Sequence, residues 1–160
     1  WEFLEEGLRL LMQGLAKAIA RDGEGATCLI EVKVDGSSSD VFARQIAKTI
    51  CSSSLVKTAV NGSDPNWGRI VAAAARSGVE FQANDLTLWL GPYKLMDAGK
   101  PIEFDRILAS KFIRERKKGN YLVDDIVPIH LRVGSGPGYG LAWGCDLSVD
   151  YVHINADYTT

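Results

Sequence analysis

The chain has 160 residues, of which 46% are hydrophobic and 24% charged, a composition typical of one globular domain with a sizeable core. Its formal net charge is −2 and no stripe of lysine and arginine stands out, which argues against a dedicated nucleic-acid binder. No apolar run approaches the roughly 20 residues of a membrane helix, and three cysteines without CxxC spacing indicate buried, reduced thiols rather than a disulfide framework or a zinc site.

The first elements alternate between helix and strand. Over residues 3–20, leucine and isoleucine recur at spacings of three and four, which predicts an amphipathic helix. The glycines of "RDGEG", residues 21–25, end this helix. Apolar and polar residues then alternate over residues 26–36, which predicts a half-buried strand. A further helix is expected over residues 41–53, with Asp40 as its N-cap.

The middle of the chain is expected to hold three strands and a helix. Residues 55–60 are interpreted as a short strand. Asp64 suits an N-cap and Pro65 the first helical position, so a helix is predicted from there through the alanine-rich run. Strands follow over residues 85–91 and 93–104, the latter with a turn at residues 97–99.

The last third is expected to hold a helix over residues 105–119 and then strands up to the end of the chain. "GSGPGYG", residues 134–140, lacks the Lys-Ser/Thr ending of a phosphate loop and precedes a strand, so we interpret it as a flexible hairpin connection. Adjacent strands joined by glycine-rich turns favour a mixed or antiparallel sheet. The sequence therefore predicts one α+β domain spanning residues 1–160.

Glu24 stands between Gly23 and Gly25, directly before the predicted buried strand. Flanking glycines let the backbone approach a ligand or adopt positive φ. A carboxylate at such a point can accept charge-assisted hydrogen bonds from an ammonium group. The alternative is a turn residue that only ends the helix, and the local sequence favours neither.

Other polar groups are better explained structurally. Asp146 and Asp150 lie four apart on a strand pattern, and although paired carboxylates can do acid–base work, a solvated strand face is the better interpretation. At "SDPNWGRI", residues 63–70, we expect Trp67 to pack into the core and Arg69 to satisfy a nearby oxygen rather than to bind an anion. His130 and His153, the two histidines, show no metal-ligand spacing.

Four stretches together resemble the ornithine acetyltransferase family, the bifunctional glutamate N-acetyltransferases of arginine biosynthesis. These are "RDGEGATCLIEV", "SSSLVKTAVNGSDPNWGRI", "AWGCDLSVDYV" and "INADYTT", and they occur in the family's order. The resemblance implies the family's fold, a two-sheet sandwich flanked by helices, and identifies the chain as the C-terminal part of a β chain. The start at Trp1 is likewise expected of a piece of a longer polypeptide.

The resemblance also implies a mechanism. The family's precursor cleaves itself into α and β chains, and the new N-terminal threonine takes acetyl from N-acetylornithine and passes it to glutamate in ping-pong order. Bifunctional members also use acetyl-CoA. No metal or organic cofactor is implied. The expected partner is an α chain in an (αβ)2 or larger assembly, in a plastid or mitochondrion of a eukaryote or the cytoplasm of a bacterium.

Three residues match the family's substrate-binding positions: Glu24, Asn155 and Thr160. The threonine nucleophile lies upstream in the family, so no catalytic residue is expected in these 160 residues. Ala75 stands where the family leads us to expect glycine. The alternative function is a non-catalytic relative retained as a structural subunit of a larger assembly.

Overall fold

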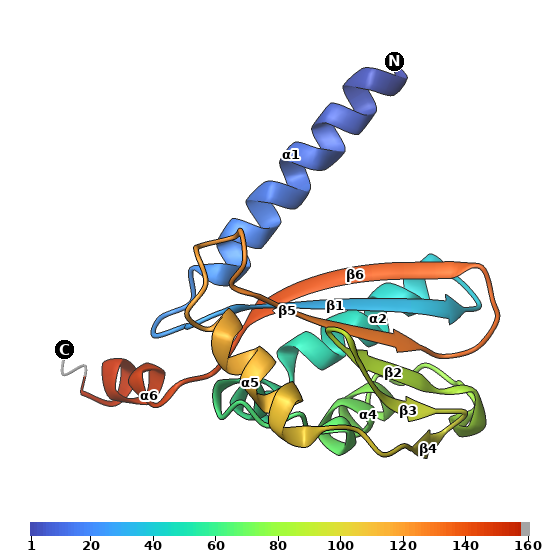
Figure 1. The fold of residues 1–160 in the computed structure, drawn as a ribbon. Coiled ribbons are helices and arrows are strands. Elements are labelled where there is room, and N and C mark those ends of the chain that lie inside the picture. Colours follow the sequence, from blue (N-terminus) through green and yellow to red (C-terminus); the bar gives the residue numbers. More distant parts are fainter. Residues whose placement is uncertain (158–160) are drawn as a thin grey trace.

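A computed structural model describes residues 1–157 of the chain (Figure 1). The strands are β1 (Leu29–Ser37), β2 (Thr87–Leu90), β3 (Tyr93–Asp97), β4 (Lys100–Pro101), β5 (Ile126–Arg132) and β6 (Gly138–Cys145). The α-helices are α1 (Glu2–Arg21), α2 (Asp40–Ser52), α3 (Ser54–Asn61), α4 (Trp67–Ala75), α5 (Arg106–Arg116) and α6 (Val149–Ala156). A 3₁₀ turn spans Ala83–Asp85.

The strands form a six-stranded mixed sheet in the order β4-β3-β2-β5-β1-β6. β1 lies between β5, with which it pairs in parallel, and β6, with which it pairs antiparallel. The remaining pairs are antiparallel: β2, β3 and β4 follow one another through tight turns, and β2 also pairs with β5. The α+β class is thus confirmed. Of the two sheets that the family resemblance implies, the described residues form one.

The predicted alternation of β1 sets the two faces of this sheet. Ile30, Val32 and Val34 are fully buried and belong to the hydrophobic core together with the apolar face of α2. The opposite face is polar. There Glu31 accepts hydrogen bonds from Trp143 Nε1 at 2.7 Å and forms an ion pair with Lys17 Nζ of α1 at 2.8 Å.

α1 forms as predicted and extends away from the sheet (Figure 1). None of its residues is buried, and its apolar stripe is exposed along its whole length: Leu4, Leu8, Leu11, Leu15 and Ile19. None of the helices in residues 1–157 is both long and apolar enough to cross a membrane.

The predicted strand at residues 55–60 is wrong, because this segment forms helix α3. Val56, Ala59 and Val60 are buried at the three- and four-residue spacing of a helix. A six-residue segment with four apolar residues fits either structure, and packing against the core decides. The next helix, α4, is capped by Asn66, whose Oδ1 accepts from Arg69 N at 3.1 Å, and not by Asp64.

Two further local predictions need correction. The N-cap of α2 is Ser39, whose Oγ accepts from Phe42 N at 3.3 Å, while the Asp40 carboxylate accepts from Tyr139 N of β6 at 2.9 Å. The prediction of strands up to the end of the chain is wrong for Val149–Ala156, which form helix α6.

Residues 134–140 do not form the predicted hairpin, since β5 and β6 pair with opposite sides of β1. The segment instead crosses the end of β1. Its glycines allow this close crossing: a Cβ at Gly136 would lie 2.2 Å from Ser37 O, and one at Gly138 would lie 2.4 Å from Ser39 C.

Candidate functional site

The candidate site lies where the chain enters β1 and leaves β6. In the antiparallel register Leu29 is opposite Cys145, so the segment before β1 and the segment after β6 run side by side. The end of α1, the turn at residues 22–28 and helix α6 therefore occupy the same end of the sheet (Figure 1).

This register brings together two of the three predicted substrate-binding residues. Asn155 Nδ2 on α6 donates a hydrogen bond to Glu24 Oε2 at 2.7 Å, across 131 residues of sequence. The same amide nitrogen donates to Tyr151 O, one helical turn earlier, at 2.9 Å. Both amide hydrogens thus point at acceptors, which fixes the orientation of the Asn155 side chain. The third predicted residue, Thr160, lies outside the described residues.

The polar atoms of Glu24 and Asn155 that have no hydrogen-bond partner among residues 1–157 are acceptors. Within residues 1–157, Glu24 Oε1 and Asn155 Oδ1 receive no hydrogen bond, and no described lysine or arginine forms an ion pair with Glu24. Both side chains are exposed, so a ligand can reach them. A carboxylate and an amide oxygen side by side suit a donor-rich cation such as an ammonium group.

The turn that carries Glu24 is held in one conformation by close contacts. Gly25 has φ +66°, a value that favours glycine, and a Cβ there would lie 2.8 Å from Ser148 Oγ and 2.9 Å from Tyr151 N. A Cβ at Gly23 would lie 2.4 Å from Cys145 Sγ. The flanking glycines therefore let the turn press against β6 and the start of α6.

Asp146 anchors the segment that follows this turn. Its carboxylate is 2% exposed and accepts hydrogen bonds from Thr27 N at 2.7 Å, Thr27 Oγ1 at 2.6 Å, Cys28 N at 3.1 Å and Asn61 Nδ2 at 2.6 Å. The prediction of a solvated Asp146 on a strand face is wrong, because the residue follows β6 and turns inward. Asp150 does not share its face, since it is exposed on α6.

A second anchor holds the same segment from the other side. Arg21, the last residue of α1, donates from Nη1 to Ala26 O at 3.0 Å and from Nη2 to Thr27 O at 3.1 Å. Its Nε forms a hydrogen bond of 2.6 Å with Asp125, a fully buried carboxylate. The guanidinium thus ties the end of the helix to the backbone before β1.

The three free thiols do not form a reactive centre. Burial raises the pKa of Cys51 to about 12, and burial together with the nearby Asp146 carboxylate raises the pKa of Cys28 to about 12. Thiols with such pKa values stay protonated near neutral pH and are poor nucleophiles. Cys145 is half-buried below Gly23. The expectation of mostly buried cysteines is confirmed for Cys28 and Cys51.

The polar face of the sheet holds the other charged cluster. His130 stacks on Trp89 with 4.6 Å between ring centroids, and its Nε2 lies 2.7 Å from Asp35 Oδ2. Partial burial acts to raise the pKa of Asp35, but hydrogen bonds from Arg132 and His130 outweigh it and hold that pKa below its usual value. His153 is exposed on α6. No cluster of His, Cys, Asp and Glu that could hold a metal occurs within residues 1–157.

Arg69 behaves as predicted. Its Nη1 donates to Leu55 O at 3.0 Å and to Thr58 Oγ1 at 3.3 Å, both on α3. Trp67 packs partly buried against the core. The start of α4 is therefore linked to α3 by the hydrogen bonds of Arg69.

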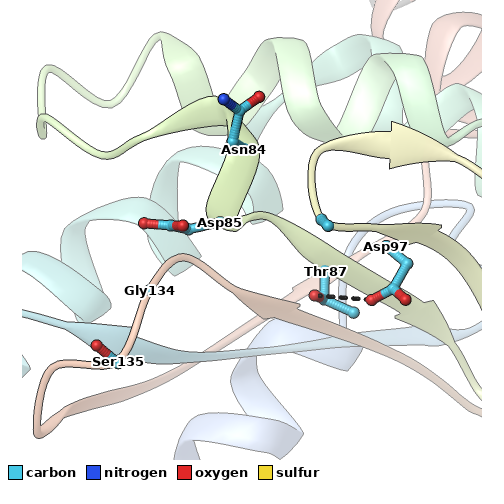
Figure 2. Close-up of a pocket in the computed structure, with 7 residues that line it drawn as sticks. Asn84, Asp85, Thr87, Asp97, Gly134 and Ser135 are labelled. Atoms are coloured by element: carbon cyan, nitrogen blue, oxygen red, sulfur yellow. Dashed lines mark hydrogen bonds between the residues drawn. The ribbon is translucent and has the colours of Figure 1, made fainter.

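A hollow of about 300 Å³ lies at the opposite end of the sheet, where β5 ends (Figure 2). It is lined by Asn84, Asp85, Thr87, Asp97, Ala98, Gly134 and Ser135. Of its two acidic residues, Asp85 and Asp97, the latter is already paired, since Asp97 Oδ1 accepts from Thr87 Oγ1 at 3.4 Å and lies 2.7 Å from Lys94 Nζ. The hollow shares no residue with the pair of Glu24 and Asn155.

Sequence reasoning missed the residues that hold the site together. Asp146 was assigned to a solvated face, and Ser148 was not singled out. The available signal was a serine directly before residues 149–156, as expected of an N-cap, but the strand interpretation of that stretch concealed it.

Comparisons with known proteins all match the chain to one protein family. The ArgJ family profile matches residues 1–160. The chain is 62% identical over 157 residues to the arginine biosynthesis bifunctional protein ArgJ of Prochlorococcus marinus strain NATL2A, covering 98% of this chain and 37% of that protein. It is 58% identical over 159 residues to the corresponding protein of Synechocystis sp., covering 99% and 38%.

A solved structure agrees in fold. The crystal structure of arginine biosynthesis bifunctional protein ArgJ from Bacillus halodurans matches with a TM-score of 0.91 at 42% identity, over 99% of this chain and 70% of that one. The present chain thus spans 37% and 38% of the length of the two curated relatives described above.

Proposed function

The chain belongs to the ArgJ family, and from that membership we propose that it forms part of an acetyltransferase of arginine biosynthesis. In this proposal the enzyme moves an acetyl group from N-acetylornithine to glutamate. The present residues supply one wall of the amino-acid pocket, and residues outside them supply the nucleophile.

The pairing of Glu24 with Asn155 is the observation that carries the proposal. Two exposed side chains 131 residues apart are held at 2.7 Å, with their remaining acceptor atoms unoccupied within residues 1–157. N-acetylornithine carries an ammonium group on its side chain, away from the acetyl group that reacts, whereas the α-nitrogen of glutamate is the attacking amine. A carboxylate and an amide oxygen can receive that ammonium group through charge-assisted hydrogen bonds.

The proposed chemistry is a ping-pong exchange on a threonine. The threonine Oγ attacks the acetyl carbonyl of N-acetylornithine and gives its proton to the threonine's own amine. Collapse of the tetrahedral intermediate breaks the amide bond, and the departing ornithine nitrogen takes that proton. The amine of glutamate then attacks the acetyl ester and loses a proton to the same threonine amine. The second tetrahedral intermediate collapses, and the departing threonine oxygen takes that proton back. Oxyanion-hole donors stabilise both tetrahedral intermediates.

The proposal extends to the assembly and to the second acetyl donor. By analogy with the family, the chain is combined with an α chain and with the preceding β-chain residues in an (αβ)2 or larger particle. Acetyl-CoA is the proposed donor of a second reaction, the net acetylation of glutamate. The two curated relatives described above are from cyanobacteria, which favours the bacterial alternative, the cytoplasm, among the expected compartments.

The test is acetyl transfer by the full-length polypeptide that contains this chain, with Glu24→Gln as the variant. This change keeps the shape of the side chain and removes the charge. A hydrogen bond to a charged group contributes about 1.5–3 kcal/mol. We therefore expect KM for N-acetylornithine to rise by about 10- to 100-fold. Glu103→Gln is the matched control, because Glu103 is also an exposed glutamate and lies outside the site.

Two results would contradict the proposal in different ways. Absence of acetyl transfer by the wild-type polypeptide would favour the alternative of a non-catalytic structural relative. Transfer with equal KM values in the Glu24→Gln and Glu103→Gln variants would support the proposed activity but contradict the proposed role of Glu24.

A further inference from the structure

Ser148 lies between the two elements that carry the proposed substrate-binding residues. Its Oγ donates a hydrogen bond to Gly25 O at 2.7 Å, in the turn that holds Glu24. The same oxygen accepts from Tyr151 N at 3.3 Å, in the first turn of the helix that holds Asn155. One hydroxyl, 9% exposed, therefore joins the turn to the helix.

The backbone next to this contact has little remaining freedom. Ala26 O and Thr27 O are held by Arg21, and the amides of Thr27 and Cys28 are held by Asp146. Only the part of the turn around Glu24 and Gly25 lies beyond these anchors. Besides the bond from Asn155 to Glu24, the bond from Ser148 to Gly25 O is thus the contact that holds the backbone of the turn against the start of α6.

Helix capping alone does not require this arrangement. An N-cap side chain needs only to accept from an amide of the first turn, as Ser39 does from Phe42 N at the start of α2. Ser148 accepts in the same way but also donates its proton across to another element, 123 residues away in sequence. The second bond sets the distance at which Glu24 can meet Asn155.

We infer that Ser148 is a positioning residue for the amino-acid substrate: it holds the Glu24 turn against α6, so that Glu24 and Asn155 face the same ammonium group. The inference rests on the proposed function, because it assigns to Ser148 the geometry of that pocket. Preorganised acceptors bind a cation better than acceptors that must first be ordered. Loss of the hydroxyl should therefore weaken substrate binding more than it affects the chemical step.

The experiment compares three substitutions of Ser148 in the full-length polypeptide, assayed for transfer from N-acetylornithine to glutamate. Ser148→Ala removes both hydrogen bonds. Ser148→Gly also removes both, but glycine is a good N-cap, so helix stability is largely kept. Ser148→Thr keeps the hydroxyl. We expect KM for N-acetylornithine to rise about 10-fold in the alanine and glycine variants, with kcat within about twofold, and to return to near the wild-type value in the threonine variant.

Ser39→Ala is the matched control, because it removes an N-cap bond of the same length at the opposite end of the sheet. It should lower thermal stability without raising KM. A double-mutant cycle adds a sharper readout: if Ser148 acts through Glu24, then Ser148→Gly should raise KM far less in a Glu24→Gln background than in the wild type.

The outcomes separate the inference from the proposed function. If Glu24→Gln raises KM but Ser148→Gly behaves like Ser39→Ala, then Ser148 is only a helix cap and the inference is overturned. The same holds if the effects of Ser148→Gly and Glu24→Gln are fully additive. If Glu24→Gln itself leaves KM unchanged, the proposed role of Glu24 is wrong, and the inference about Ser148, which rests on it, is wrong as well. Should the alanine variant not fold, the glycine and threonine variants still decide.

Discussion

Substitution of Asp146 tests whether a buried carboxylate anchors the segment before β1. In the structure its two oxygens accept four hydrogen bonds, two of them from backbone amides, and the side chain is 2% exposed. Asp146→Ala leaves these donors without partners in the interior. Each unsatisfied buried donor costs about 1–3 kcal/mol, and partial entry of water lowers the sum, so we expect a loss of about 4 kcal/mol.

Asp146→Asn should have a smaller effect with a recognisable pattern. The amide oxygen can still face Thr27 N and Cys28 N, while the new NH2 group faces the amide of Asn61 and the hydroxyl of Thr27. The Thr27 hydroxyl can rotate to accept, and the Asn61 amide must reorient. Loss of charge assistance and this rearrangement together predict a loss of about 2 kcal/mol.

Two measurements check these values. Urea unfolding gives the change in free energy of unfolding, with an unchanged m-value required for the comparison. Amide hydrogen exchange over residues 22–30 gives the local effect, which for Asp146→Asn should be about 30-fold faster exchange at Thr27 and Cys28, the equivalent of about 2 kcal/mol. Asp150→Ala is the control, since Asp150 is exposed on α6. If Asp146→Ala costs no more than Asp150→Ala, the anchoring role is wrong.

Two other predictions follow from contacts in and near the same site. Gly23→Ala should raise KM several-fold, because the new methyl group would lie 2.4 Å from Cys145 Sγ and must displace the Glu24 turn. Adding Cys145→Ala to the same chain removes that sulfur and should return KM to near the wild-type value. A double variant with KM still raised would contradict the steric explanation. The pKa values of Cys28 and Cys51 are raised to about 12 by burial, so folding favours the protonated thiols. Their contribution to stability is complete below pH 9 and is lost as pH rises from about 9 to about 12, which urea unfolding across that range should reveal. Alkylation of these two thiols at pH 9 should proceed only on unfolding, and equal rates in folded and urea-unfolded chain would refute their burial.

Periodic sequence patterns predicted the long elements well. α2 and β1 show an apolar pattern whose apolar residues are buried in the core, so local pattern and tertiary packing agree there. α1 forms from its local pattern alone, since its apolar stripe is exposed. The turn at residues 97–99 was also predicted, and Ala98 and Gly99 adopt positive φ there.

The errors fall on short segments. α3 and α6 each have eight residues, rich in β-branched and small side chains, and both were interpreted as strands. Isolated helices of this length are marginal in water, so their conformation depends on what they pack against or which residue caps them. The core receives one side of α3, which the local pattern does not show. Ser148 caps α6, and although a serine there is a local N-cap signal, the apolar residues after it fit a strand as well.

The sequence by itself determined the local properties of the site: a carboxylate between two glycines, an alternating strand after it, and motifs that resemble one enzyme family. Only the tertiary structure decided that Glu24 meets Asn155 and that Asp146 and Ser148 hold the segments between them. The physical reason is that these contacts depend on the register of β1 against β6, which is set by burial of one face of the whole sheet. That register is a property of the assembled core, and no short stretch of the chain encodes it alone.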